Sequence, residues 1–140
     1  MEVPYRYLEN PPAKMKEFSR TLEEADAIVL ASPEYNGQLS GALKNTLDYF
    51  YPEYSKKPIG VMTVSSGQLG GINASYGLQS LALSLGGYPM PYKLLVKGVT
   101  KAFDENGALV DEQLSQSFDK FKSELIWFTA ALKEAKLITN

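Results

Sequence analysis

The chain has 140 residues, which is the length of one ordinary domain, and its formal net charge is −2. This charge provides no general basic field for a nucleic acid or for an anionic membrane surface. Cysteine and histidine are absent, which excludes disulfides, thiolate and histidine catalysis, and metal sites that use either residue. Redox or acid–base chemistry would therefore have to come from a bound cofactor or from tyrosines and carboxylates.

The first dozen residues contain two acids, an arginine and three prolines, and they lack the apolar segment of a signal peptide. The longest apolar run, at 27–31, is too short to span a bilayer. No linker or internal repeat divides the sequence. We therefore expect a cytoplasmic protein with a single domain over residues 1–140 and no membrane partner.

Helical and strand patterns alternate along the chain. Residues 12–25 have helical apolar spacing, and the continuous apolar run at 27–31 predicts a strand buried on both faces. A second helix is expected to begin at Gly41 and to end before Pro52, and a second buried strand is expected at 59–64. The glycine-rich segment 65–71 leads into a third helix that ends at Gly86, before a third strand at 93–96. A final helix is expected at about 111–136, with an apolar face made by Leu114, Phe118, Phe121, Leu125, Phe128 and Leu132.

This alternation predicts a three-layer α/β/α domain with at least three parallel strands. In such folds, ligands bind beyond the carboxyl ends of the strands. Two loops follow buried strands there: Ser-Pro-Glu-Tyr-Asn-Gly at 32–37 and the glycine-rich segment 65–71. Each loop alone is also consistent with a plain role, as a turn carrying a surface tyrosine or as a tight strand–helix connection. Together, a tyrosine and a glycine backbone at adjacent strand ends predict a slot for a flat aromatic ring. No Walker-type lysine follows either loop.

The two loops and the segment after the first one resemble the NADPH-dependent FMN reductases, which are flavodoxin-like proteins that include quinone, chromate and azo-dye reductases. Residues 33–36 are Pro-Glu-Tyr-Asn, and residues 40–49 are similar to the family pattern Pro-Gly-x-Leu-Lys-Asn-Ala-hydrophobic-Asp-Trp. Ser40 stands where the family has proline, and Tyr49 stands where it has tryptophan. The glycine segment and the later stretch Phe-Asp-Glu-Asn-Gly at 103–107 are also similar to the family.

The resemblance implies a flavodoxin-like fold with FMN and NADPH as cofactors and a quinone, free flavin or metal oxyanion as the small-molecule electron acceptor. It implies no catalytic side chain and no metal, because the flavin carries the chemistry. It also implies a homodimer or higher homo-oligomer, with an interface around Leu43, Leu47 and Phe50. The residues that it implies for holding the flavin ring are Pro33, Glu34, Tyr35, Asn36, Ser65, Ser66, Gly67, Gly70 and Gly71.

The front of the chain departs from the family, whose members begin with a strand, a phosphate-binding loop, a helix and a second strand. Residues 3–5 resemble instead the stretch that follows the second strand. We therefore expect the strand at 27–31 to be an open edge that promotes self-association. We also expect FMN to bind weakly, with little preference over riboflavin. The alternatives are a non-catalytic flavodoxin-like interaction module that has lost the cofactor, and a flavin electron carrier without NADPH turnover.

Overall fold

The structure, a computed structural model, describes the backbone of residues 7–138 and the side chains of residues 7–135. The expectation for residues 3–5 lies outside this part of the chain. The elements in chain order are α1 (Ala13–Glu24), β1 (Ile28–Tyr35), β2 (Gln38–Leu39), α2 (Gly41–Tyr49), the 3-10 helix η2 (Pro52–Tyr54), β3 (Pro58–Val64), α3 (Ile72–Ser84), β4 (Tyr88–Val96), α4 (Val99–Ala102) and α5 (Glu112–Ile138).

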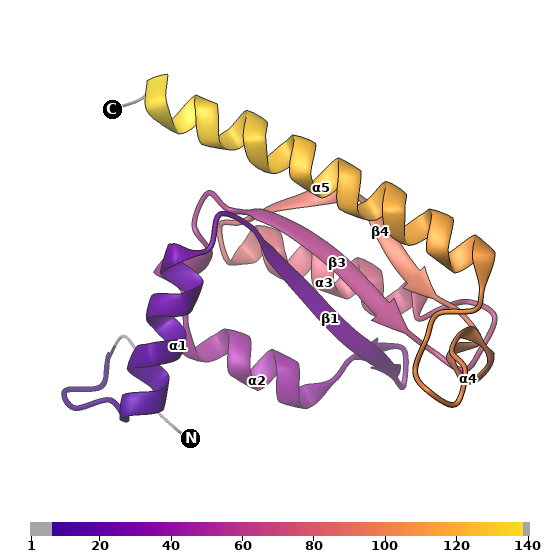
Figure 1. Cartoon of the computed structure of the whole chain (residues 1–140). Helices are drawn as coiled ribbons and strands as arrows, with labels where there is room; N and C mark the ends of the chain where they lie inside the picture. Colours follow the sequence, from indigo (N-terminus) through magenta and orange to yellow (C-terminus); the bar gives the residue numbers. More distant parts are fainter. Residues whose placement is uncertain (1–6, 139–140) are drawn as a thin grey trace.

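The strands form one sheet in the order β2-β1-β3-β4. Strands β1, β3 and β4 run parallel, and the short β2 pairs antiparallel with the end of β1. Helix α5 lies along one face of the sheet, while α2 and α3 lie on the other (Figure 1). The expected flavodoxin-like three-layer α/β/α arrangement and its three parallel strands are therefore confirmed.

Each face of the sheet has its own apolar core. On the side of α1, α2 and α3 the cluster includes Leu30, Ile59 and Leu78, and on the side of α5 it includes Leu94 and Phe121. The burial of two large clusters on opposite faces is what holds a parallel sheet in the middle layer.

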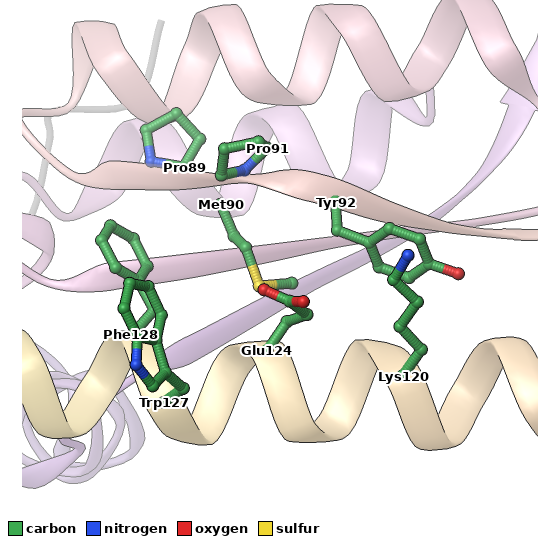
Figure 2. A pocket seen from close by; sticks show the side chains of 8 residues that line it. All are labelled: Pro89, Met90, Pro91, Tyr92, Lys120, Glu124, Trp127 and Phe128. Atoms are coloured by element: carbon green, nitrogen blue, oxygen red, sulfur yellow. The ribbon is translucent and has the colours of Figure 1, made fainter.

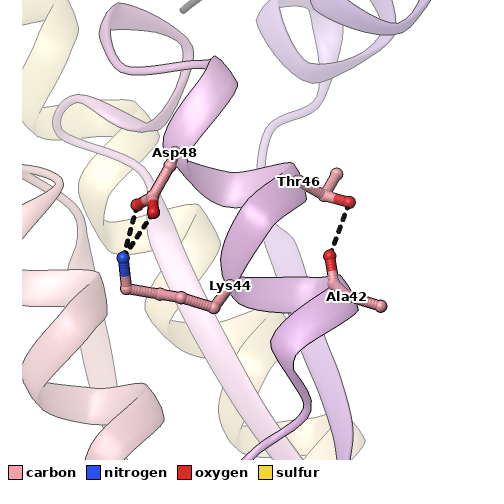
Figure 3. A network of polar contacts seen from close by, with 4 residues as sticks. All are labelled: Ala42, Lys44, Thr46 and Asp48. Carbon is pink, nitrogen blue, oxygen red and sulfur yellow. Dashed lines mark hydrogen bonds and ion pairs between the residues drawn. The ribbon is translucent and has the colours of Figure 1, made fainter. Parts of the chain in front are cut away.

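The expected dimer surface on α2 is wrong in two of its three positions. Leu47 and Phe50 are each only 3% exposed and belong to the core between α2 and the sheet. Leu43 is half-buried and packs against the same cluster. The apolar face of α2 is therefore used inside the chain. Its outer face is polar: Lys44 Nζ lies 2.7 and 2.5 Å from the Asp48 carboxylate oxygens, and Thr46 donates to the Ala42 carbonyl (Figure 3).

Strand β1 differs from the sequence-based expectation in two ways. It continues to Tyr35, so the segment expected to be a loop is mostly strand. It is also buried on one face only, because Val29 is 44% exposed and Ala31 is exposed as well. Helix α5 contacts β3 and β4 chiefly, which leaves this side of β1 uncovered in the described part of the chain. Phe118, expected in the core face of α5, is likewise exposed.

The two ends of the sheet have different chemistry. On the side of β1 that faces away from β3, the described residues supply a pairing partner only at Glu34 and Tyr35, through β2, so residues 28–33 form an open edge there, as expected. At the other end, β4 carries Pro89 and Pro91, which have no N–H to donate to a further strand. A register shift in the β3–β4 pairing lies between Ile59 and Val61, opposite these prolines.

Among the described residues, no helix has the length and apolar character that crossing a bilayer requires.

Candidate flavin site at the carboxyl ends of the strands

Three loops meet where β1, β3 and β4 end. Pro33 pairs with Val64, which in turn pairs with Val96, so the residues after these positions lie along one rim. Backbone hydrogen bonds join the loops: Ser65 N–H donates to the Val96 carbonyl at 2.9 Å, and Gly98 N–H donates to Gly67 at 3.2 Å. The rim is therefore a continuous backbone structure and not a set of independent loops.

The first loop is a tight hairpin that presents Tyr35. Asn36 and Gly37 have φ values of 52° and 76°, which is the left-handed pair that a two-residue type I′ turn requires. At the base of the hairpin the buried Ser32 hydroxyl accepts from Ser40 N–H at 2.9 Å and donates to the Pro33 carbonyl at 2.8 Å. The Tyr35 side chain stands out from this turn and is 62% exposed.

Glu34 connects the hairpin to the start of α3. Its carboxylate accepts from Ala74 N–H at 3.0 Å and from the Asn73 side-chain amide at 3.5 Å. A carboxylate at a helix N-terminus satisfies free N–H groups and interacts favourably with the helix dipole. The resemblance implies Glu34 as a flavin-binding residue, but its carboxylate is bonded to Asn73 and Ala74. Glu34 would therefore act on a ligand by positioning the two loops.

The second loop has a buried anchor and an exposed arm. Gly70 and Gly71 are both buried with left-handed φ values of 61° and 77°. A Cβ on Gly71 would lie 3.0 Å from Thr63 Cβ, so glycine, which also tolerates the left-handed φ, lets the start of α3 approach β3 this closely. Thr63 fixes the anchor further by donating to the Gly70 carbonyl at 2.7 Å.

The exposed arm comprises residues 66–69. Gly67 N–H donates to the Ser65 hydroxyl at 3.0 Å, which sets the bend at the start of the arm. Next to the arm, the Lys97 side chain packs on Gly70, because a Cβ built there would meet Lys97 Cγ at 2.9 Å. Tyr76 lies one turn along α3 from Asn73, and Lys93 Nζ of β4 lies 3.3 Å from the centroid of its ring. Burial lowers the pKa of Lys93.

The rim fits the flat ring of a flavin better than its phosphate. The rim carries an exposed tyrosine ring and an exposed, glycine-containing backbone, which offer a flat apolar surface and N–H and C=O groups. A phosphate would need free N–H groups at a helix N-terminus. At α2, Leu43 N–H is already bonded to the Ser40 hydroxyl at 3.3 Å, and at α3 the Glu34 carboxylate takes this place.

The structure thus brings together both predicted loops, Pro33 to Asn36 and Ser65 to Gly71. Sequence reasoning missed Ser32 and Thr63, which hold the two loops in place. Both are polar residues inside otherwise apolar strand runs, and that was a signal for an internal hydrogen bond. Nothing in the sequence pattern indicated that Asn73 and Ala74 would bind Glu34.

A sequence model of the NADPH-dependent FMN reductase family matches residues 2–101 of the chain. The chain belongs to this family. Within the family it is similar to an NAD(P)H-dependent FMN reductase of Pseudomonas aeruginosa, with 33% identity over 108 residues that cover 74% of this chain and 58% of the relative. It is also similar to a quinone reductase of Pseudomonas putida, with 34% identity over 125 residues that cover 82% of this chain and 67% of the relative.

An NADPH azoreductase of Bacillus sp. strain OY1-2 is 34% identical over 126 residues, which cover 87% of this member of the FMN reductase family and 67% of the azoreductase. The chain thus spans 58 to 67% of the length of these three relatives. Among solved structures, the flavoenzyme FerB of Paracoccus denitrificans, an NAD(P)H:(acceptor) oxidoreductase, has the same fold. Its TM-score is 0.72 at 22% identity, over 95% of this chain and 76% of FerB.

Proposed function

We propose that this FMN reductase family member is an NAD(P)H-dependent flavin oxidoreductase whose rim holds the flavin ring between Tyr35 and the arm at residues 66–69. The redox chemistry, transfer of a hydride from NADPH and onward to a quinone, free flavin or metal oxyanion, belongs to the flavin. The supporting observation is the Glu34 bridge to Ala74 N–H at 3.0 Å, which holds both loops at one rim.

The role of this chain's residues is to bind and orient. Tyr35 offers a ring face at the strand end, and the backbone of the arm offers groups that match the polar edge of a flavin. Gly71 permits the close approach of α3 to β3, and the Glu34 carboxylate joins the start of α3 to the hairpin that carries Tyr35. No acid or base is required from the protein in this proposal, which agrees with a chain that lacks histidine and cysteine.

We further propose that FMN binds with little preference over riboflavin. Hydrogen bonds to a charged group contribute about 1.5–3 kcal/mol each, so the lack of two phosphate contacts lowers affinity about a hundredfold or more. The occupied N-termini of α2 and α3, the second with a carboxylate, support this.

Calorimetric titration with FMN and with riboflavin tests the flavin proposal. We expect both ligands to bind with similar constants, and Tyr35→Ala to weaken both by roughly two- to tenfold, since an aromatic contact contributes about 0.5–1.5 kcal/mol. Tyr88→Ala is the matched control, because Tyr88 is also exposed but lies at the opposite end of the sheet. A submicromolar FMN constant with much weaker riboflavin would show a phosphate site elsewhere on the chain.

A second candidate function is the non-catalytic interaction module. It is favoured by the carboxylate at the N-terminus of α3, which disfavours an anion there. A flavin-loaded chain that oxidises NADPH when a quinone is present supports the enzyme. Protein that stays colourless with added flavin and oxidises no NADPH supports the module, and flavin binding without NADPH oxidation supports an electron carrier.

We also propose that the chain forms a homodimer or higher homo-oligomer through β1. Its open edge and the exposed Val29 and Ala31 form a surface that a second β1 can pair with and cover. Sedimentation at micromolar concentration should show association that Val29→Lys weakens, because a charge on this face disfavours burial. A clean monomer for the unmodified chain would contradict this proposal.

A further inference from the structure

Outside the rim, a groove of about 590 Å³ lies between the first half of β4 and α5 (Figure 2). Met90 and Tyr92 line it from β4, and Lys120, Glu124, Trp127 and Phe128 line it from α5. A volume of this size is typical of small-molecule sites. The groove lies towards the amino end of β4, whereas the flavin rim lies at the carboxyl ends, so the groove is separate from the proposed flavin site.

Trp127 dominates one end of the groove. It is the only tryptophan of the chain, and it is 68% exposed although it is the largest apolar side chain present. The residues that follow it by one helical turn are Ala130 and Ala131, which are too small to cover the indole. An accessible indole face attracts cations through the negative charge of its ring face.

Two carboxylates flank Trp127 along α5. Glu124 precedes it by one turn, and Glu134 follows it by seven residues on the same side of α5. Neither the Glu124 carboxylate nor the indole N–H has a hydrogen-bond or ion-pair partner in the described part of the chain. The two side chains also share the wall of an adjoining hollow, so the carboxylate is accessible from both sides.

Lys120 already shows how a cation sits in this groove. Its ammonium lies 4.8 Å from the centroid of the Tyr92 ring, at the end away from Trp127. Seven residues of helix separate Lys120 from Trp127, which is about 10 Å along the axis. Glu124 lies between them, so the repulsion that Lys120 exerts on a second cation at Trp127 is reduced.

We propose that this groove binds a small aromatic organic cation, whose charged centre lies between the Glu124 carboxylate and the Trp127 indole and whose ring packs against Phe128. This occupant matches the two kinds of group that the groove leaves unused, a carboxylate without an ion-pair partner among the described residues and an open aromatic face. A neutral aromatic compound would use only the second, and an anion would be repelled by the first.

The test titrates the chain with benzyltrimethylammonium and follows the fluorescence of the single tryptophan and the NMR shift of its indole proton. Benzyl alcohol and benzenesulfonate are the neutral and anionic comparators with the same ring. We expect saturable binding of the cation with a preference of roughly tenfold over benzyl alcohol, and no saturation with the sulfonate.

The decisive variant is Glu124→Gln, which keeps the shape of the side chain and removes its charge. It should reduce the preference for the cation severalfold and leave the weak binding of benzyl alcohol unchanged. Glu112→Gln, at the start of the same helix, is the control and should change neither. Equal binding of the cation and benzyl alcohol would overturn the proposal, as would Glu124→Gln without effect, or a tryptophan signal that changes with protein concentration alone and so reports a second copy in the groove.

Discussion

Replacing Gly71 with alanine tests the close approach on which the candidate site depends. Gly71 has a φ of 77°, and the added Cβ would lie 3.0 Å from Thr63 Cβ and 3.2 Å from its hydroxyl oxygen. Thr63 is fully buried, and its hydroxyl is bonded to the Gly70 carbonyl, so it cannot move without losing that hydrogen bond. The substitution therefore combines an unfavourable backbone conformation with overpacking.

Gly107→Ala separates the two effects. Gly107 has nearly the same φ, 79°, but nothing lies within 4 Å of the Cβ position. A left-handed conformation costs an L-residue about 1–2 kcal/mol, part of which is offset by the lower entropy of the unfolded alanine chain, so we expect a loss of about 1 kcal/mol. Overpacking adds about 1–3 kcal/mol at Gly71, for a total loss of about 2–4 kcal/mol.

Urea unfolding measures this difference directly. With an m value of about 2 kcal/mol/M, the midpoint should fall by about 0.5 M for Gly107→Ala and by about 1–2 M for Gly71→Ala. Flavin affinity should also fall for Gly71→Ala alone, because the start of α3, which bonds Glu34 of the hairpin, is pushed away from β3. Equal midpoints for the two variants would refute the packing argument, since the backbone term is common to both.

Three further outcomes are expected. Glu34→Gln should destabilise the chain by about 1 kcal/mol, because it removes a negative charge from the N-terminus of α3. In calorimetry the same variant should raise the affinity for FMN relative to riboflavin. An unchanged ratio of the two affinities would show that this carboxylate does not act on the phosphate. Burial raises the pKa of Tyr54 above its ordinary value of 10.0, with added contributions from the Glu53 and Asp48 charges, so its contribution to stability is complete below about pH 10 and is lost as the pH rises further. Because the Tyr54 hydroxyl is buried without a partner among the described residues, Tyr54→Phe should leave stability unchanged or raise it by up to about 1 kcal/mol and flatten this alkaline decline, which thermal melts across pH can measure. Lys57→Met should cost about 2 kcal/mol in urea unfolding, because the buried Lys57 ammonium bonds the carbonyls that end α1, whereas a loss below about 0.5 kcal/mol would show that these contacts add nothing net.

The main features of the fold were predictable because they depend on local patterns. Continuous apolar runs gave β1 and β3, and the four-and-three spacing gave α5 nearly to its observed bounds. The length of β1 was mispredicted because Pro33 resembles a strand breaker. On an edge strand, however, a proline does not remove an essential hydrogen bond, so β1 continues to Tyr35. The Asn36-Gly37 pair is a strong hairpin signal, and it could have predicted β2.

Tertiary contacts were not predictable from these patterns. The apolar spacing in α2 predicts an apolar face, but it does not indicate whether this face packs on the chain's own sheet or on a second copy. The burial of Leu47 and Phe50 shows that it packs within the chain. Likewise, both loops were correctly placed at one rim by the rule for strand ends. The direction of the Glu34 carboxylate depends on how α3 begins, forty residues later in the chain at Ala74.

The unlike ends of the sheet determine how far an assembly through strand pairing can grow. If two copies pair their β1 edges about a two-fold axis, each copy uses the edge whose residues 28–33 are open on that side. The far ends of the joined sheet are then two copies of β4, each carrying Pro89 and Pro91, which offer no donors to a third chain. Such pairing is isologous and ends at two subunits, whereas a fibre would need an edge that accepts further strands at both ends. In the proposed dimer, the prolines of β4 therefore remove two of the donors that a further strand would need at each outer edge.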